Sequence, residues 1–356
     1  VYLSNNNIDN DLEKLVCDNL DLGDIIGCAG EVFLTKTKEL SIRAKSITLL
    51  AKNIRPLPNL KEKDGESFNA FSDKESRYRY RHLDLIANPG NKDVFIKRSK
   101  VINSLRSFLN SNDYLEVETP VLQPLYGGAT ARPFKTFHNA LDRELFLRIA
   151  DELYLKRLII GGYDKVFEIA KDFRNEGVDR SHNPEFTMCE FYQAYSDVYD
   201  MMDMTEKLIK YIACSMDIDK ITFNSHSINF KEDFEKVSFV DELNKALNTD
   251  FLNLNKQELI KVAEENDIFL DKNLSYGKVV DKLFGELVEP KLLNPTFVLD
   301  YPKLISPLAK KKRNTEADVV ERFELFIGGM EFANSFSELN DPVEQRARLE
   351  EIIKST

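Results

Sequence analysis

The stretch FRNEGVDRSHNPEF (Phe173–Phe186) decides the fold, because it reads as the end of one strand, a polar loop and the start of a second strand. Gly177 and Asn183–Pro184 mark the loop. Arg174 and Glu176 stand two positions apart, so we predict that they project from one face of the first strand. An arginine here can bind a phosphate through two parallel hydrogen bonds. Alone, an Arg–x–Glu pair more often forms a structural salt bridge.

The second strand carries a row of residues with period two, Phe186, Met188, Glu190 and Tyr192, which we predict to share one face. An aromatic side chain suits stacking on adenine. A carboxylate beside a phenol suits an ammonium group. The simpler alternative places Phe186 and Tyr192 in the core and pairs Arg174 with a buried carboxylate.

Hydrophobic periodicity places further elements on both sides of this stretch. GDIIGCAGEVFL (23–34) and ELSIRAKSITLL (39–50), separated by TKTK, are typical of two strands of a small β-barrel, and NIRPLPNLKEKDGESF (53–68) of a linker. Helices are predicted at 94–109 and 151–160, strands at 115–122, 165–176, 185–195, 295–302 and 322–336, and mostly helical structure at 200–290. Without regular βαβ alternation, this order favours an α+β fold with a largely antiparallel sheet.

Composition limits the class of protein. The chain has 356 residues, 42% of them hydrophobic and 31% charged, which is typical of a globular protein, and no apolar run approaches the ~20 residues of a membrane helix. The formal charge of −11 disfavours non-specific binding to nucleic acid, although Lys61, Lys63 and Lys310–Arg313 are candidates for a local basic face or a solvated loop. Cys17, Cys28, Cys189 and Cys214 lack the spacing of a zinc site, so we expect free thiols in a reducing cytoplasm.

The quoted stretch resembles motif 2 of the class II aminoacyl-tRNA synthetases, and HNPEFTMCEFYQAY (182–195) is most similar to the lysyl enzymes. SFLNSNDYLEVETPVLQP (107–124) resembles motif 1, which forms the dimer interface of that family. GGATARPF (127–134) and RIADELYLKR (148–157) resemble the family segments that form the amino-acid pocket. RFELFIGGMEFANSFSELNDP (322–342) resembles its metal-binding and lysine-binding strands, and RYRYRHLDLIAN (77–88) resembles its link between domains. The resemblance covers nearly the whole chain and is weakest at 215–290.

The resemblance implies a partial OB-fold anticodon-binding domain at 1–56, a linker at 57–76 and a class II catalytic domain at 77–356, an antiparallel sheet flanked by helices with a mostly helical insertion around 215–290. Motif 3, which closes the family's ATP site, has no counterpart. We therefore expect the sequence to be part of a longer protein; the alternative is a fragment that is inactive on its own. Asp113, Asp151 and Met330 stand where the family commonly has glycine, proline and a basic residue.

The resemblance also implies the roles of individual residues. The residues expected to bind ATP are Arg174, Glu176, His182, Asn183, Phe186 and Glu324. Those expected to bind lysine are Gly128, Ala129, Glu152, Arg174, Glu190, Tyr192, Asn334, Phe336 and Glu338, and those expected to hold Mg²⁺ are Glu324 and Glu331. Arg174 is the expected catalytic residue. The implied activity is ATP-dependent formation of lysyl-adenylate with release of pyrophosphate, then transfer of lysine to tRNA(Lys) by a homodimer.

Three alternatives stay open at this point. A non-catalytic relative would bind tRNA or a protein, but Arg174, Glu324 and Glu331 speak against loss of catalysis. A ligase that attaches lysine to proteins would lack the amino-terminal barrel. Aspartyl or asparaginyl specificity would require a cationic or amide group in the pocket, whereas Glu152, Glu190 and Glu338 favour a cationic substrate.

Overall fold

The computed structural model describes residues 1–3, 18–55, 57–58, 60–63, 66–69, 71–179, 182–271 and 274–355. For residues 60–63, 66–69 and 351–355 the description is confined to the backbone. The chain divides into two compact units, Val1–Ser99 and Lys100–Thr356. Each unit is described by itself.

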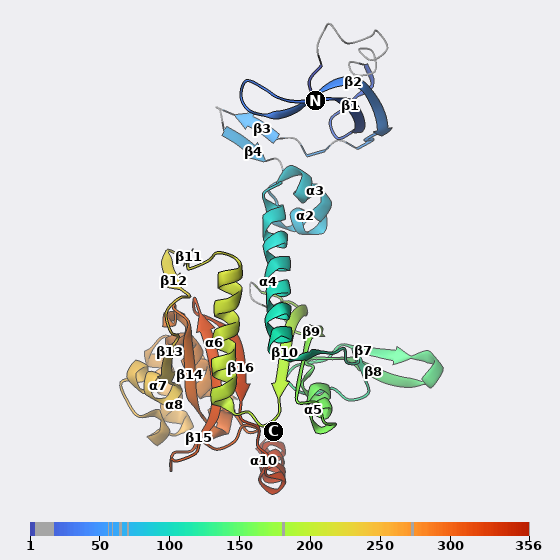
Figure 1. Cartoon of the computed structure of the whole chain (residues 1–356). Coiled ribbons are helices and arrows are strands. Elements are labelled where there is room, and N and C mark those ends of the chain that lie inside the picture. The colour runs from blue at the N-terminus through green and yellow to red at the C-terminus, as the bar shows by residue number, and fades with distance from the viewer. Residues whose placement is uncertain are drawn as a thin grey trace. The chain divides into compact units, whose positions relative to one another are not determined.

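The first unit is built on a long antiparallel hairpin of β1 (Ile25–Leu34) and β2 (Leu40–Ala51), where the alternating sequence predicted two strands (Figure 1). Lys38 turns the chain with a left-handed φ of 62°. The register shifts at Gly30, where a Cβ atom would lie 2.0 Å from the carbonyl oxygen of Arg43, so only glycine fits. Ala44 and Ile47 of β2 form the small buried core of this unit.

A second hairpin, β3 (Leu60–Lys63) and β4 (Glu66–Asn69), lies within the segment whose composition indicated a linker. Two short helices follow, α2 (Lys74–Arg79) and α3 (Arg81–Ala87). The side chain of Asp84 is fully buried between them and accepts hydrogen bonds from Arg77 and Arg81 at 2.7 and 2.5 Å. The charge-assisted bond from Arg77 joins α2 to α3, and the bond from Arg81 lies within α3.

The helix predicted at 94–109 is α4 (Asn91–Ser111). The helix ends at Ser111, and two residues later Asp113 has the left-handed conformation expected after the helix, with a φ of 65°. Phe108 and Leu109 at the end of the helix pack with Tyr114 and Phe167 in a buried cluster.

The second unit contains a three-stranded sheet with the order β10-β9-β5. Its long pair, β9 (Lys165–Phe173) and β10 (Glu185–Gln193), is antiparallel. The strand predicted at 115–122 is wrong in extent, because Pro120, which has no backbone N–H for the ladder, separates β5 (Leu115–Glu116) from β6 (Leu122–Gln123). A neighbouring sheet has the order β6-β8-β7, with β7 (Lys135–His138) and β8 (Arg143–Leu147), and α5 (Glu152–Ile160) follows it.

A four-stranded sheet, β13-β14-β15-β16, forms the centre of the second unit. Side chains alternate between the two faces of this sheet, and helices cover both faces (Figure 1). Phe297, Phe323 and Leu325 pack against α6, whereas Val298 and Phe326 pack against α7 and α9. The elements of this part are β13 (Glu235–Ser238), β14 (Thr296–Pro302), β15 (Val319–Ile327), β16 (Met330–Phe336), α6 (Val198–Ser215), α7 (Phe239–Leu247), α8 (Lys256–Glu265), α9 (Tyr276–Leu287) and α10 (Pro342–Ser355).

The β14–β15 and β15–β16 pairs are antiparallel, and the β13–β14 pair is parallel. The prediction of helices combined with largely antiparallel sheets is therefore confirmed. The region predicted as mostly helical also contains a hairpin, β11 (Lys220–Phe223) and β12 (His226–Asn229), turned by two left-handed residues, Asn224 and Ser225. Short 3₁₀ helices connect the elements at η1 (Asn139–Leu141), η2 (Phe251–Asn253), η3 (Glu289–Lys291) and η4 (Lys303–Ile305).

Candidate functional site

Arg174 stands at the neck of the loop that joins β9 to β10. The prediction that Arg174 and Glu176 share a strand face is wrong, because β9 ends at Phe173. The Arg174 backbone N–H donates to the Pro184 carbonyl at 2.9 Å and closes the loop. Its guanidinium lies 5.0 Å from the ring centre of Phe186, within cation–π range. Arg174 and Phe186 therefore lie close together at the neck of the loop.

The tip of the loop is solvent-exposed. Glu176, His182 and Asn183 are all exposed, and residues 180 and 181 lie outside the described residues. The His182 backbone N–H and ring Nδ1 each lie 2.8 Å from a different carboxylate oxygen of Asp179. These contacts connect the two sides of the loop, and the side chains of Glu176, His182 and Asn183 are exposed to solvent.

Glu190 lies on β10 beyond Phe186, and both of its carboxylate oxygens have a donor. The Tyr192 hydroxyl donates to Oε2 at 2.9 Å, and the Asp151 backbone N–H donates to Oε1 at 3.2 Å. Burial, which outweighs these bonds, raises the pKa of Glu190 to about 7. Within the part of the chain that the structure describes, no ion pair joins Glu190 to a cation.

Two other predicted pocket carboxylates share a cation that the sequence reasoning missed. Lys156 Nζ lies 2.6 Å from Glu152 and 2.8 Å from Glu338, and 5.4 Å from the ring centre of Phe336. Three predicted pocket residues thus meet around one internal ammonium group. The i,i+4 spacing of Glu152 and Lys156 on α5 was the signal that could have revealed this pair.

The predicted glycine loop lies against the start of α5. Gly128 has a φ of 88°, which favours glycine, and a Cβ atom there would lie 3.0 Å from the Glu152 Cβ and 3.1 Å from the Ala150 Cβ. Ala129 follows it in a half-buried position. Gly128 therefore lies against Glu152, another residue that the resemblance assigns to the lysine pocket.

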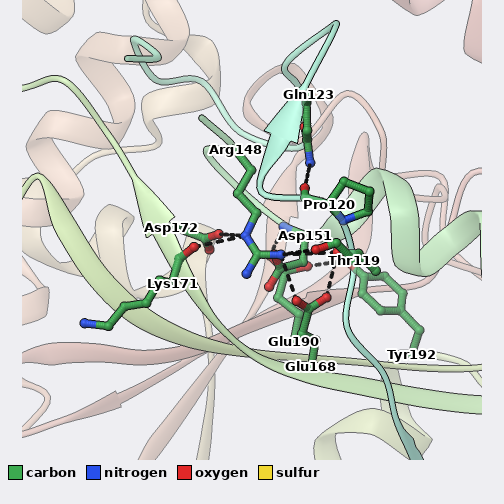
Figure 2. Close-up of polar contacts among 10 residues, drawn as sticks. All are labelled: Thr119, Pro120, Gln123, Arg148, Asp151, Glu168, Lys171, Asp172, Glu190 and Tyr192. Atoms are coloured by element: carbon green, nitrogen blue, oxygen red, sulfur yellow. Dashed lines mark hydrogen bonds and ion pairs between the residues drawn. The ribbon is translucent and has the colours of Figure 1, made fainter. Parts of the chain in front are cut away.

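A buried charge network lies beneath the pocket, with Arg148 at its centre (Figure 2). Arg148 Nη1 lies 2.7 Å from Glu168 and 3.0 Å from Asp151, and its Nε lies 3.3 Å from Asp172. The Thr119 hydroxyl donates to Glu168 at 2.7 Å. One guanidinium thus faces three carboxyl groups, so the network carries an excess of negative charge if all of them are ionised.

Asp151 and Asp172 are fully buried, and their carboxylate oxygens accept no hydrogen bond among the described residues. Burial, followed by the Asp172 carboxylate, raises the pKa of Asp151 to about 8 in spite of Arg148. Burial also raises the pKa of Asp172. Burial therefore opposes ionisation of both carboxyl groups. Oxygen atoms of Asp151, Asp172 and Glu190 lie within 4.8 Å of one another, a grouping that could also hold a metal ion.

A second acidic group lies on the four-stranded sheet. Glu324 is paired with Arg322 and accepts a 2.8 Å hydrogen bond from Tyr301 and a 3.3 Å bond from Asn334, its partner on β16. Desolvation and then Glu324 raise the pKa of Glu331 to about 7, while Arg174 lowers it. Glu331, Glu324 and Arg174 therefore interact electrostatically, although they come from distant parts of the sequence.

Other sequence expectations concern cysteine and basic residues. Cys28, Cys189 and Cys214 are free thiols, and Cys17 lies outside the described residues, as do the side chains of Lys61 and Lys63. In the basic run, Lys312 lies 2.6 Å from Asp300, and Arg313 lies 2.9 Å from Asp197. Half of that run is thus engaged with acidic residues.

Comparison with known proteins shows the family of this chain. A family described as tRNA synthetases class II (D, K and N) matches residues 73–356. This chain belongs to that family. It is 48% identical over 336 residues to the lysine–tRNA ligase of Azobacteroides pseudotrichonymphae, covering 94% of this chain and 67% of the relative.

Two further relatives show the same identity. The lysine–tRNA ligase of Christiangramia forsetii is 48% identical over 347 residues, 97% of this chain and 60% of the relative, and that of Staphylococcus epidermidis is 48% identical over 332 residues, 93% and 66% respectively. The synthetase chain thus spans about two thirds or less of the length of these relatives. None of the helices that the structure describes combines the length and hydropathy needed to cross a membrane.

Proposed function

We propose that the protein containing this chain activates L-lysine with ATP, releases pyrophosphate and transfers lysine from lysyl-adenylate to the 3′ end of tRNA(Lys). The observation that carries the proposal is Glu190. Its two oxygens are held by Tyr192 and the Asp151 N–H, and no cation pairs with it among the described residues. A held carboxylate of this kind is suited to an ammonium group. The names of the relatives, all lysine–tRNA ligases, support the same substrate.

The nucleotide would lie across the loop neck and the four-stranded sheet. Arg174 would bind the α-phosphate and steady the lysine carboxylate, and Phe186 would stack on adenine. The positive charge of Arg174 would stabilise the charge that develops as the lysine carboxylate attacks the α-phosphorus. Because the attacking group is the substrate's own carboxylate, the reaction requires no side-chain nucleophile, and positioning supplies much of the rate.

Mg²⁺ fits the residues around Glu324 and Glu331. Carboxylate oxygens are the ligands that this hard cation prefers. Desolvation and the proximity of Glu324 raise the pKa of Glu331 to about 7, and the same two causes raise that of Glu289 to about 7. The group is thus too negative to ionise completely and would be stabilised by a divalent cation. When bound, the ion would neutralise charge on the phosphates, and Glu324 and Glu331 would hold it.

Lysine specificity would follow from charge. Glu190 would receive one ammonium group, and Glu152 and Glu338, already 2.6 and 2.8 Å from Lys156, would complete an acidic wall. An aspartate or asparagine side chain would bring no cation to this wall. Loss of a buried charge pair of this type costs roughly 2–5 kcal/mol, which is sufficient to reject both.

The remaining assignments are part of the proposal. The β1–β2 hairpin supports an OB-fold anticodon-binding domain at residues 1–56, with the catalytic domain beginning at 77. Segment 107–124, which resembles motif 1, would form a homodimer interface. The free thiols of Cys28, Cys189 and Cys214 support a reducing cytoplasmic location.

Pyrophosphate exchange with the full-length protein tests the proposal. Lysine, aspartate and asparagine are compared at equal concentration with ATP and Mg²⁺. We expect exchange with lysine alone, followed by charging of tRNA(Lys). Exchange with aspartate or asparagine and not with lysine would overturn the assignment, and no exchange with any of the three would favour a non-catalytic relative.

A further inference from the structure

Glu338 projects from a stretch of backbone whose two neighbouring residues are buried. Ser337 and Leu339 are each 6% exposed, whereas the side chain of Glu338 is 46% exposed. Because successive side chains of an extended chain point to opposite sides, burial of both neighbours turns Glu338 outward, where it lies 2.8 Å from Lys156 Nζ. The position of this pocket carboxylate therefore depends on what holds the backbone around it.

The segment 307–310, called the strap below, holds that backbone. The Leu339 N–H donates to the Leu308 carbonyl at 3.1 Å, and the Lys310 N–H donates to the Ser337 carbonyl at 2.8 Å. The pocket carboxylate leaves the chain between these two bonds. A shift of the strap would therefore move the carboxylate as well.

Arg348 of α10 binds the strap. Its Nη1 donates to the Pro307 carbonyl at 3.1 Å and to the Ala309 carbonyl at 2.8 Å. Ala309 stands opposite Glu338 in an antiparallel bridge, so Arg348 contacts the strap at the level of the pocket carboxylate. Arg348 is only 4% exposed, and Glu344, one turn earlier on α10, pairs with its guanidinium. A buried guanidinium with this many acceptors is held in one orientation.

We propose that Arg348 is a positioning residue for lysine recognition: through the strap, it fixes the place of the Glu338 carboxylate in the pocket. The inference rests on the proposed lysine specificity and deepens it. Arg348 acts through main-chain carbonyls of the strap, and the substrate would contact Glu338. Asp341 caps the start of α10 by accepting from the Val343 and Glu344 N–H groups at 2.9 and 3.1 Å, so the helix that carries Arg348 begins close to Glu338.

Loss of the guanidinium would affect one side of the site. The buried Ala309 carbonyl would lose this donor, and the strap would have to shift to restore a partner. The preceding residues have a separate anchor, because Arg322 donates to the Ser306 hydroxyl at 2.6 Å and to the Ile305 carbonyl at 3.3 Å. We therefore expect the disturbance to reach Glu338 and to leave the nucleotide-binding side of the site, at Arg174, in place.

A double-substitution cycle separates a positioning role from a general structural one. Arg348→Gln removes the guanidinium, and Glu338→Gln removes the pocket charge while keeping the shape of the side chain. The two single variants, the double variant and the wild type, all as full-length protein, are titrated calorimetrically with lysine and, separately, with ATP. Arg346→Gln makes the same charge change at an exposed residue of α10 and is the matched control. Arg348→Lys is the conservative variant, because it keeps a positive donor.

At pH 7 we expect Arg348→Gln and Glu338→Gln each to raise the lysine Kd about tenfold. The double variant should match Glu338→Gln within about twofold, because displacing a neutral side chain costs no further charge interaction. Arg348→Lys should recover lysine affinity to within about threefold of the wild type, and Arg346→Gln should leave it unchanged. The ATP Kd should stay within about twofold in every variant.

Multiplying effects in the double variant, parallel losses of lysine and ATP affinity, or an unchanged lysine Kd in either single variant would overturn the inference. Hydrogen exchange of the Leu339 amide, which is bonded to the strap, gives a measurement on the wild-type protein that applies even if Arg348→Gln does not fold. Slower exchange with saturating lysine supports the inference, and unchanged or faster exchange overturns it. A wild-type protein that binds no lysine would instead overturn the proposed function.

Discussion

The substitution Glu190→Gln tests the centre of the lysine pocket. Glutamine keeps the shape of the side chain and can still accept a hydrogen bond from Tyr192, now 2.9 Å from Oε2, or from the Asp151 N–H. What it loses is the charge that would face the substrate ammonium group. The substitution therefore changes electrostatics and leaves packing nearly intact.

The magnitude follows from the environment of Glu190. Truncating one partner of a buried, hydrogen-bonded charge pair costs roughly 2–5 kcal/mol. Glu190 is only half-buried by side-chain exposure, and its pKa of about 7 means that burial already opposes its charge. The lower end of the range therefore applies, about 2–3 kcal/mol, or roughly a 30- to 150-fold increase in the lysine Kd.

The assay is calorimetric titration of the full-length protein with lysine and with ATP across pH 6–9. Because burial raises the pKa of Glu190 to about 7, wild-type lysine affinity should increase as the pH rises through 7 and level off above 8. Glu190→Gln should lose this increase. Glu144→Gln, at an exposed residue 3.2 Å from Lys135, serves as the control and should match the wild type.

Two results would refute this reasoning. If Glu190→Gln weakened lysine and ATP equally, the residue would support the site as a whole and would not recognise lysine. If lysine affinity kept its pH dependence in the variant, another group would be responsible for the titration.

Three further predictions concern other charged groups. Lys156→Met should lower the lysine Kd about three- to tenfold, roughly 1 kcal/mol of binding free energy, because it removes the internal ammonium group that competes with the substrate for Glu152 and Glu338. A weaker lysine affinity in the variant would instead mean that Lys156 holds these two carboxylates in place. Glu321→Gln should lower the unfolding free energy measured in urea by about 1–3 kcal/mol at pH 7, because hydrogen bonding to Arg313 lowers the Glu321 pKa from 4.5 to about 2. The stability difference between wild type and variant should vanish as the pH falls from 4.5 to about 2, and a difference that stays constant would disprove this prediction. Glu331→Gln should raise the Mg²⁺ concentration needed for half-maximal pyrophosphate exchange about tenfold, without changing lysine binding in the absence of nucleotide. An unchanged Mg²⁺ requirement would show that Glu331 is not a metal ligand.

Local sequence signals predicted much of the fold. Alternating hydrophobic residues located β1, β2, β9, β10 and β14, and helical spacing located α4 and α5. Two strand boundaries were wrong. β9 ends before Arg174, an end that side-chain alternation does not mark, and Pro120 divides the segment 115–122 for the local reason that proline has no backbone N–H. The β11–β12 hairpin in the 215–290 region depends on a turn of two left-handed residues, Asn224 and Ser225, which the hydrophobic pattern does not predict.

For the site, the sequence by itself determined which chemical groups are present: an arginine beside an aromatic residue, a carboxylate two positions from a phenol, and acidic residues on the last strands. These are local in the chain and follow strand alternation. Tertiary structure alone decided which of these charges are neutralised by distant residues. The pairs Lys156–Glu338, Arg148–Glu168 and Arg148–Asp172 join segments far apart in sequence, whereas Lys156–Glu152 and Arg148–Asp151 are local pairs, four and three residues apart. The strength of a charge depends on desolvation and on distance to other charges, and both are set only when the chain is folded.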